Sequence, residues 1–231
     1  MNFYETRAFI FDMDGTLVDN MHAHTEAWGK MLAENEIEMN AHDFLVKTAG
    51  KTNREIMPTV FGDISDERSA ELGNRKEMLY QELFLPVRKT VEGVVEFLEE
   101  AQKIGVRLAV STAAPVTNVE FILDGLDLRK YFQAVVTAAD VKEGKPNPEI
   151  FLKSAEKIGV EPKNCLVFED AFGGFEAAHR AGMKAIGITT VNSAEDILKI
   201  DSVVEAHADF VNLKPQELIE KYLPQTEKAG I

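Results

Sequence analysis

Short runs of apolar residues recur along this chain and are separated by stretches with helical spacing of apolar residues. The runs are Ala8–Phe11, Val106–Val110, Ala134–Val136, Leu166–Phe168 and Ala185–Ile188, with a weaker sixth at Ala208–Val211. Most are apolar throughout instead of alternating, which is typical of parallel strands covered by helices on both faces. The intervening helices are predicted at Val94–Ile104, Val116–Leu126, Pro148–Ile158, Phe175–Ala181 and Pro215–Tyr222. Strand alternating with helix predicts an α/β fold with a doubly wound parallel sheet.

One long stretch, from about Asn20 to Arg88, contains no convincing strand. Its apolar spacing predicts helices at Met21–Glu34, Asp43–Lys47, Arg54–Val60 and Asp66–Leu85. We therefore predict a catalytic core formed by residues 1–19 and 89–231, and an inserted helical domain formed by residues 20–88. Because the insertion leaves the core beside a strand end, we interpret it as a lid, with a purely decorative insertion as the alternative.

Composition narrows the possible partners. The chain has 231 residues, of which 45% are hydrophobic, so it can bury the core of one domain that carries an insertion. It has 25 basic and 39 acidic residues and a formal net charge of −14, so its surface repels nucleic acid and anionic membranes. We expect no nucleic-acid partner, and nothing in the pattern requires more than a monomer.

Location is inferred from what the sequence lacks. No segment approaches the roughly 20 apolar residues of a membrane span, and the first residues contain no apolar signal-peptide core. The single cysteine, Cys165, lies beside an apolar run and is interpreted as a small buried hydrophobe in a reducing compartment. These features predict a cytoplasmic protein without a membrane partner.

Two carboxylates, Asp12 and Asp14, directly follow the first apolar run, and Gly15 allows a sharp turn out of the strand. Ligands of doubly wound sheets bind at the carboxyl ends of the strands. Asp12 can act there as a nucleophile that forms an aspartyl phosphate, while Asp14 protonates the leaving oxygen. Carboxylates so close together disfavour double ionisation, which helps to keep one protonated near neutral pH. Two ordinary acids in an acidic chain are the alternative, which their position disfavours.

A hydroxyl and a lysine follow later strands. Thr112 ends the second run, and its hydroxyl can donate to a phosphoryl oxygen beside the Ala113 amide. Ser111 remains an alternative source of this hydroxyl, and both could merely cap the next helix. Lys145 precedes Pro146, which favours an extended backbone and a fixed positive charge for phosphate and Asp12.

A second acidic pair, Glu169 and Asp170, follows the fourth run and precedes the flexible pair Gly173 and Gly174. With Asp12 and the Asp14 carbonyl, these residues would form an all-oxygen site suited to Mg²⁺. No cluster of His and Cys indicates zinc.

Taken in order, these four fragments resemble the four motifs of the haloacid dehalogenase superfamily, and the resemblance spans almost the whole chain. The insertion is similar to the helical cap of the β-phosphoglucomutase-like branch. The resemblance implies a Rossmann-like core, Mg²⁺ dependence, cap closure, Asp12 as nucleophile and Asp14 as acid/base. An aspartate at position 14 is typical of the phosphatases and mutases, and the dehalogenases lack it, so dehalogenation is disfavoured.

Within that branch, His24 and Trp28 resemble β-phosphoglucomutase positions, where the histidine couples cap closure to the acid/base aspartate. His22 is an alternative. The residues expected to contact substrate are Gly15, Ala113, His24, Gly50, Lys51, Arg54 and Lys76. Those expected to act in catalysis are Asp12, Asp14, Thr112 and Lys145, and the expected metal ligands are Asp12, Asp14, Glu169 and Asp170.

The chain also departs from the mutases. They carry a lysine before the cap glycine, where this chain has Ala49, and Ser-Lys after the second motif, where it has Ala113-Ala114-Pro115. Because a mutase must hold a second, distant phosphate, we predict a Mg²⁺-dependent phosphatase of small phosphorylated metabolites such as sugar phosphates. The alternative is a β-phosphoglucomutase that interconverts β-glucose 1-phosphate and glucose 6-phosphate. A signalling receiver also phosphorylates an aspartate near a threonine and a lysine, but it is a single small domain without such an insertion.

Overall fold

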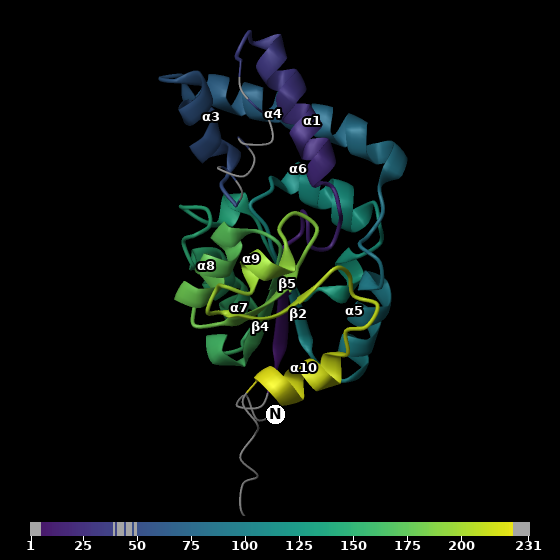
Figure 1. Cartoon of the computed structure of the whole chain (residues 1–231). Helices are drawn as coiled ribbons and strands as arrows, with labels where there is room; N and C mark the ends of the chain where they lie inside the picture. Colours follow the sequence, from purple (N-terminus) through teal and green to yellow (C-terminus); the bar gives the residue numbers. More distant parts are fainter. Residues whose placement is uncertain (1–5, 39, 41–43, 45–47, 49, 224–231) are drawn as a thin grey trace, which may run out of the picture.

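The computed structural model describes residues 6–38, 40, 44, 48 and 50–223, and its strands form one parallel sheet (Figure 1). The strands are β1 Ala8–Phe11, β2 Arg107–Ser111, β3 Ala134–Val136, β4 Cys165–Glu169, β5 Lys184–Ile188 and β6 Val203–His207. Their order across the sheet is β3-β2-β1-β4-β5-β6, and every neighbouring pair is parallel. The predicted α/β fold with a Rossmann-like parallel sheet is confirmed.

The register of the central strands explains why distant sequence fragments meet. Strand β1 lies between β2 and β4, and Phe11 at its end pairs with Val110 on one side and Phe168 on the other. The residues that follow these three positions therefore emerge together at the carboxyl edge of the sheet.

The side chains of β1 contribute to two apolar layers, one on each face of the sheet, because successive strand side chains point to opposite faces. Phe9 and Phe11 pack with Phe97 and Phe168, with ring centroids 5.7 Å apart for Phe9–Phe97 and 4.6 Å for Phe11–Phe168. Ala8 and Ile10 belong to a second cluster on the opposite face, which includes residues of the helices α7 (Glu149–Ile158) and α8 (Phe172–Arg180). Both faces of the strand are thus buried, as its unbroken apolar sequence indicates.

Apart from the short helix Ala194–Ile197, which the sequence pattern does not predict, the helices of the sheet region lie close to their predicted positions. They are α5 Val94–Lys103, α6 Val116–Val119, α7 Glu149–Ile158, α8 Phe172–Arg180, α9 Ala194–Ile197 and α10 Pro215–Tyr222. Short turns of other helical types are η2 Leu85–Val87, η3 Glu120–Asp124, η4 Arg129–Tyr131, η5 Ala138–Asp140 and η6 Pro162–Asn164. The predicted single helix from Val116 to Leu126 is instead a short α-helix that continues into the π-helical turn η3.

Among the described residues, three helices stand apart from the sheet, at the top of Figure 1: α1 Met21–Glu34, α3 Asn53–Phe61 and α4 Asp66–Phe84. We call them the cap helices. Both α1 and α3 pack against α4. The chain crosses between the sheet region and the cap helices twice, and the two crossings lie side by side, since Val18 forms an antiparallel bridge with Thr90. The predicted division at residues 20–88 follows these helices but stays a prediction.

Two local predictions are wrong. The sixth strand is Val203–His207, not Ala208–Val211. This strand lies at the edge of the sheet and is half-buried, so it contains the polar residues Glu205 and His207 and lacks the apolar run that predicts a strand. The apolar Phe210 lies in a loop, where it packs on Phe97 and Phe168. The predicted helix at 43–47 falls mostly outside the described residues.

The second wrong prediction concerns Gly173 and Gly174, which lie in the helix α8 and not in a flexible link. A Cβ on Gly174 would lie 1.8 Å from Glu169 Oε1, so glycine there lets the helix start against that carboxylate.

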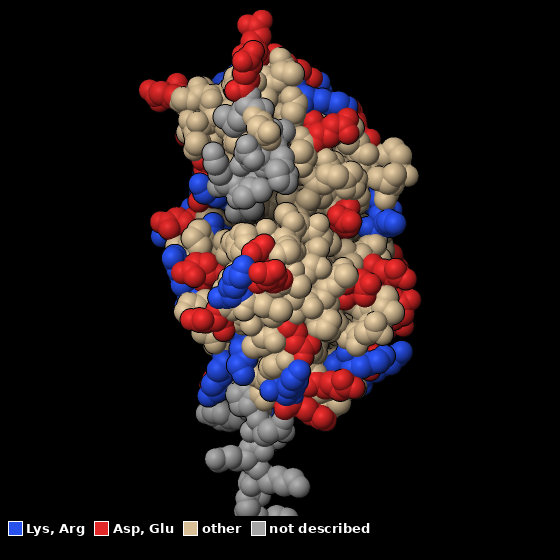
Figure 2. Space-filling model, viewed as in Figure 1, with Lys and Arg blue, Asp and Glu red and all other residues tan. Residues whose placement is uncertain are grey.

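The surface drawn in Figure 2 mixes acidic and basic side chains. Within the described residues, no helix is both long enough and apolar enough to cross a bilayer.

Candidate active site

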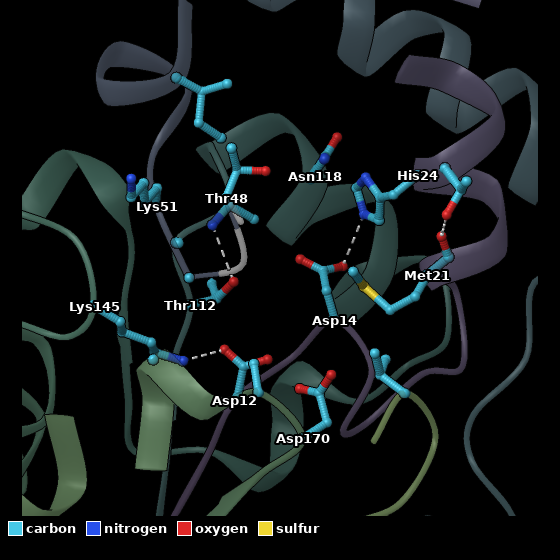
Figure 3. A pocket seen from close by; sticks show the side chains of 18 of the residues that line it. Asp12, Asp14, Met21, His24, Thr48, Lys51, Thr112, Asn118, Lys145 and Asp170 are labelled. Atoms are coloured by element: carbon cyan, nitrogen blue, oxygen red, sulfur yellow. Dashed lines mark hydrogen bonds and ion pairs between the residues drawn. The ribbon is translucent and has the colours of Figure 1, made fainter. Parts of the chain in front are cut away.

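A pocket of about 530 Å³ lies where the carboxyl ends of the strands meet the cap helices. Figure 3 shows Asp12 and Asp14 side by side in it, with Lys145 reaching toward Asp12 and His24 toward Asp14. We refer to the strand-end side of this pocket as the core half and to the side formed by α1, α3 and α4 as the cap half.

Asp12 continues the line of β1, since its N–H donates to the Phe168 carbonyl at 2.9 Å. Its carboxylate lies 2.5 Å from the ammonium of Lys145, which also contacts Glu169 Oε2 at 3.0 Å. Lys145 is only 2% exposed. Burial alone would lower the pKa of Lys145, but the two carboxylates raise it above its ordinary value, so the ammonium stays charged.

Three buried carboxylates, those of Asp12, Glu169 and Asp170, have oxygens within 4.8 Å of one another. Burial raises the pKa of Asp12 to about 6, against the pull of Lys145 and with help from Asp14. Burial, followed by the charge of Asp12, also raises the pKa values of Glu169 and Asp170 well above the ordinary range. The positive charge of Lys145 does not offset the negative charge of these three carboxylates. The cluster therefore has an excess of negative charge and a set of oxygen ligands, both of which fit a hard cation such as Mg²⁺.

Local packing holds this cluster in place. The Thr16 hydroxyl donates to Asp170 Oδ1 at 3.3 Å. A Cβ on Gly15 would lie 2.3 Å from Asp170 Oδ2, and its φ is +85°, so both the space and the backbone require glycine. The predicted role of Gly15 in substrate contact is not supported by position, because it does not line the pocket and its N–H donates to Val18 and Asn20.

The carboxylate of Asp14 is turned away from this cluster and toward the cap half. Its Oδ1 accepts from Asn20 Nδ2 at 2.6 Å and lies 3.5 Å from His24 Nε2. Burial alone would raise the pKa of Asp14, but His24, Asn20 and the charge of Lys76 bring the pKa below its ordinary value. Of the two neighbouring aspartates, Asp12 therefore has the higher pKa. The metal contact predicted for the Asp14 carbonyl stays a prediction.

His24 is held by a stack and a hydrogen bond. Its ring lies 3.8 Å from that of Tyr80, nearly parallel, and its Nδ1 is 2.8 Å from Lys76 Nζ. Because an ammonium only donates, Nδ1 accepts and the ring proton sits on Nε2, the atom that faces Asp14. Burial and the charge of Lys76 lower the pKa of His24, in keeping with a neutral ring.

In the cap half, a buried lysine and a buried glutamate neutralise each other. Lys76 Nζ contacts both carboxylate oxygens of Glu77 at 3.1 Å. Glu77 accepts in addition from Asn53 on α3 and Asn118 on α6, each at 2.7 Å. Burial alone would raise the pKa of Glu77, but Lys76 and these donors lower it.

The other predicted residues divide into two groups. Thr112, Ala113, Gly50, Lys51, His24 and Lys76 all line the pocket. Thr112 Oγ1 accepts from the Ala114 N–H, whereas Ser111 bonds to Ser154 at 2.6 Å and is not among the lining residues. Arg54 is also outside the lining, and its guanidinium donates to the Lys142 carbonyl.

Comparison with known proteins identifies the family. Residues 6–182 match the family model of haloacid dehalogenase-like hydrolases. The chain belongs to this family. The predicted resemblance is thereby confirmed, and so is the prediction of an enzyme.

Relatives of this hydrolase cover nearly its full length. It is 32% identical over 200 residues to a validoxylamine A 7'-phosphate phosphatase of Streptomyces hygroscopicus subsp. limoneus, covering 85% of this chain and 92% of that protein. It is 33% identical over 217 residues to a phosphorylated carbohydrates phosphatase of Thermotoga maritima, covering 92% and 96%. Among solved structures, a β-phosphoglucomutase of Clostridium difficile has a TM-score of 0.81 and 28% identity, covering 94% of this chain and 97% of that chain.

Sequence reasoning missed several residues of this hydrolase's site, above all Asn20. Its amide nitrogen donates to Asp14 and to the Tyr80 hydroxyl, each at 2.6 Å, and its oxygen accepts from the Gly15 N–H. An asparagine directly before a helix indicates an N-cap, yet its side chain makes no capping bond here. Only its complete burial, at 0% exposure, distinguishes it.

Proposed function

We propose that this hydrolase is a Mg²⁺-dependent phosphatase of small phosphorylated carbohydrates that works through an aspartyl phosphate on Asp12. The observation that carries the proposal is the buried group of Asp12, Glu169, Asp170 and Lys145 at the strand ends, with Asp14 beside it in the same pocket. The phosphatases of Streptomyces hygroscopicus and Thermotoga maritima named above agree with this reaction class.

The side chains can divide the reaction as follows. Lys145 and the Thr112 hydroxyl bind the phosphoryl oxygens and aim the phosphorus at Asp12. Asp12 attacks, the bond from phosphorus to the leaving oxygen breaks, and Asp14 gives that oxygen a proton. Water then attacks phospho-Asp12, Asp14 takes the proton of the water, and phosphate leaves. Bound Mg²⁺ would supply the positive charge that lets acidic side chains and a phosphate dianion share one site.

Asp14 needs a proton in the first step, although its pKa is low in the free protein. An incoming phosphate dianion raises the pKa of a nearby carboxyl, so binding itself favours the acid form. His24 Nε2 lies 3.5 Å from Asp14 Oδ1 and makes no closer hydrogen bond within the described part of the chain. We infer that it donates to Asp14 or to the sugar oxygen.

The cap half favours an uncharged far end of the substrate. Lys76 is already held by Glu77 and His24, and Arg54 is turned to the loop that contains Lys142. A second phosphate dianion there would face the Glu77 carboxylate, whereas sugar hydroxyls can use the amides of Asn53 and Asn118 and the Thr48 hydroxyl. Lys51 also lines the pocket as an exposed cation, so it is the Glu77 carboxylate and the bonds that hold Lys76 that favour a monophosphate and hydrolysis.

The test is a screen of phosphorylated sugars with Mg²⁺, measured as release of free phosphate. We expect turnover of several sugar monophosphates and little or none of the matching bisphosphates. Full activity of Asp12→Asn on each substrate that the parent hydrolyses would disprove the aspartyl-phosphate route.

A β-phosphoglucomutase is the second candidate, favoured by the similar solved structure and by the contact between His24 and Lys76. Incubation with β-glucose 1-phosphate and a trace of the 1,6-bisphosphate separates the two. Glucose 6-phosphate that forms faster than free phosphate would identify a mutase, and free phosphate alone would identify a phosphatase.

A further inference from the structure

The loop that carries Lys145 is attached to the cap segment at residues 50–55 by three hydrogen bonds. The Lys145 N–H donates to the Gly50 carbonyl at 3.1 Å, and the Gly144 N–H donates to Glu55 Oε1 at 3.0 Å. Arg54 adds a bond to the Lys142 carbonyl at 2.5 Å. The main-chain atoms that precede the Lys145 side chain are therefore held by the cap segment.

Two glycines allow this close approach. A Cβ on Gly144 would lie 2.6 Å from Glu55 Oε2 and 3.0 Å from the Gly50 carbonyl. A Cβ on Gly50 would lie 2.9 Å from the Cβ of Lys145, and its φ of +81° also favours glycine. Larger residues at either position would push the loop and the cap segment apart.

Glu55 has one carboxylate oxygen for each side of this junction. Its Oε2 accepts from the N–H and the hydroxyl of Thr52, each at 2.7 Å, which forms the capping box of α3. Its Oε1 accepts from Gly144. The capping box fixes the direction of the carboxylate, so the loop can bond to it only in one position relative to α3.

We propose that Glu55 is a positioning residue for Lys145, because it fixes the loop that sets where the ammonium meets Asp12. Glu55 does not line the pocket, so it acts only through the loop. The Lys145 ammonium must sit 2.5 Å from Asp12 and 3.0 Å from Glu169, and a shift of the main chain at Gly144 is transmitted directly to it. The effect on rate rests on the proposed phosphatase function, whereas the effect on the loop does not.

The test compares Glu55→Ala with Thr52→Val by hydrogen exchange and by steady-state kinetics with Mg²⁺. Thr52→Val removes the hydroxyl bond of the same capping box but keeps the Thr52 N–H bond that still directs the Glu55 carboxylate, and it leaves the bond between Glu55 and Gly144 intact. In Glu55→Ala we expect the amides of Gly144 and Lys145 to exchange about tenfold faster, since opening of the loop loses its anchor. We expect kcat to fall roughly tenfold or more, with a smaller change in KM, because misplaced groups slow chemistry more than binding. Thr52→Val should leave both measurements near those of the parent.

Each outcome decides the proposal. Faster exchange together with a lower kcat in Glu55→Ala alone supports it. Unchanged exchange, or faster exchange with an unchanged kcat, overturns it, and so does an equal effect in Thr52→Val. If Glu55→Ala does not fold, Glu55→Gln keeps one acceptor oxygen and should show the same two changes at reduced size. If the parent hydrolyses nothing, the proposed function fails, while the exchange at Gly144 still decides whether Glu55 anchors the loop.

Discussion

The two halves of the pocket handle charge in opposite ways. In the core half, three buried carboxylates lie together, the Lys145 ammonium contacts two of them, and the pKa values of all three acids are raised. In the cap half, Lys76 and Glu77 neutralise each other, and Asn53 and Asn118 complete the bonds of the carboxylate. The first half carries an excess of negative charge that an added cation would offset, whereas the buried charges of Lys76 and Glu77 in the second half offset each other. From this difference we expect the core half to carry out phosphoryl transfer and the cap half mainly to shape the space for the rest of the substrate.

The largest expected effect is that of Asp12→Asn. Removing the nucleophile of the core half should lower kcat by about 10⁴-fold or more, as loss of a nucleophile does in other covalent enzymes. Phosphate release under saturating substrate and Mg²⁺ measures it. The exposed Asp19→Asn, which changes the same residue type outside the pocket, serves as the control and should keep the parental rate.

Removal of the metal should have the next largest effect. EDTA should abolish activity and lower the melting temperature, because an ion that binds only the folded state adds about 2.7 kcal/mol at a hundred times its dissociation constant. Asp170→Asn should lose most of this Mg²⁺ response in thermal unfolding, while the exposed Asp201→Asn keeps it. A parent protein whose unfolding ignores Mg²⁺ would contradict the account of the core half.

Glu77→Gln tests the cap half. It leaves buried Lys76 without its carboxylate and should lower the free energy of unfolding by about 3 kcal/mol at pH 7. Because the pKa of Glu77 is lowered in the folded state from 4.5, its contribution is complete above that value and is lost as the pH falls further. Urea unfolding of both proteins should show a gap that is constant from pH 7 to 5 and narrows below 4.5. Glu82→Gln, exposed on the same helix, should show no gap.

Tyr80→Phe should have the smallest effect. It removes one acceptor of Asn20 but keeps the ring that stacks on His24 and the bond between Asn20 and Asp14. We expect a loss of about 1 kcal/mol in stability and a kcat close to that of the parent. A large fall in kcat would mean that the hydroxyl takes part in the work of Asp14, and the separation between the two halves would need revision.

The fold and the core half of the pocket could be predicted from the sequence, whereas the contacts of the cap half could not. The fold and the core half follow from short-range signals: a wholly apolar run predicts a central strand, and parallel strands bring the residues after their ends together. Asp12, Thr112, Lys145 and Asp170 were accessible in this way, and they all line the pocket.

The cap half depends on how helices pack on one another, which spacing alone does not determine. Glu77 looks like one more acid in a charged helix, and only the approach of α3 and α6 gives it partners. Arg54 was predicted to face substrate, but a carbonyl of the loop lies within reach of its guanidinium. Edge strand β6 was misplaced because one side of an edge strand tolerates polar residues.

The bridge between Val18 and Thr90 has a consequence for how this protein can diversify. Since the chain leaves the sheet region and returns to it at adjacent positions, the whole helical segment between them can be replaced without changing the path of any strand. Evolution, or a chimera made at those two positions, can thus change which molecules are accepted, provided that the new segment keeps the bonds that Gly50 and Glu55 make to the loop of Lys145.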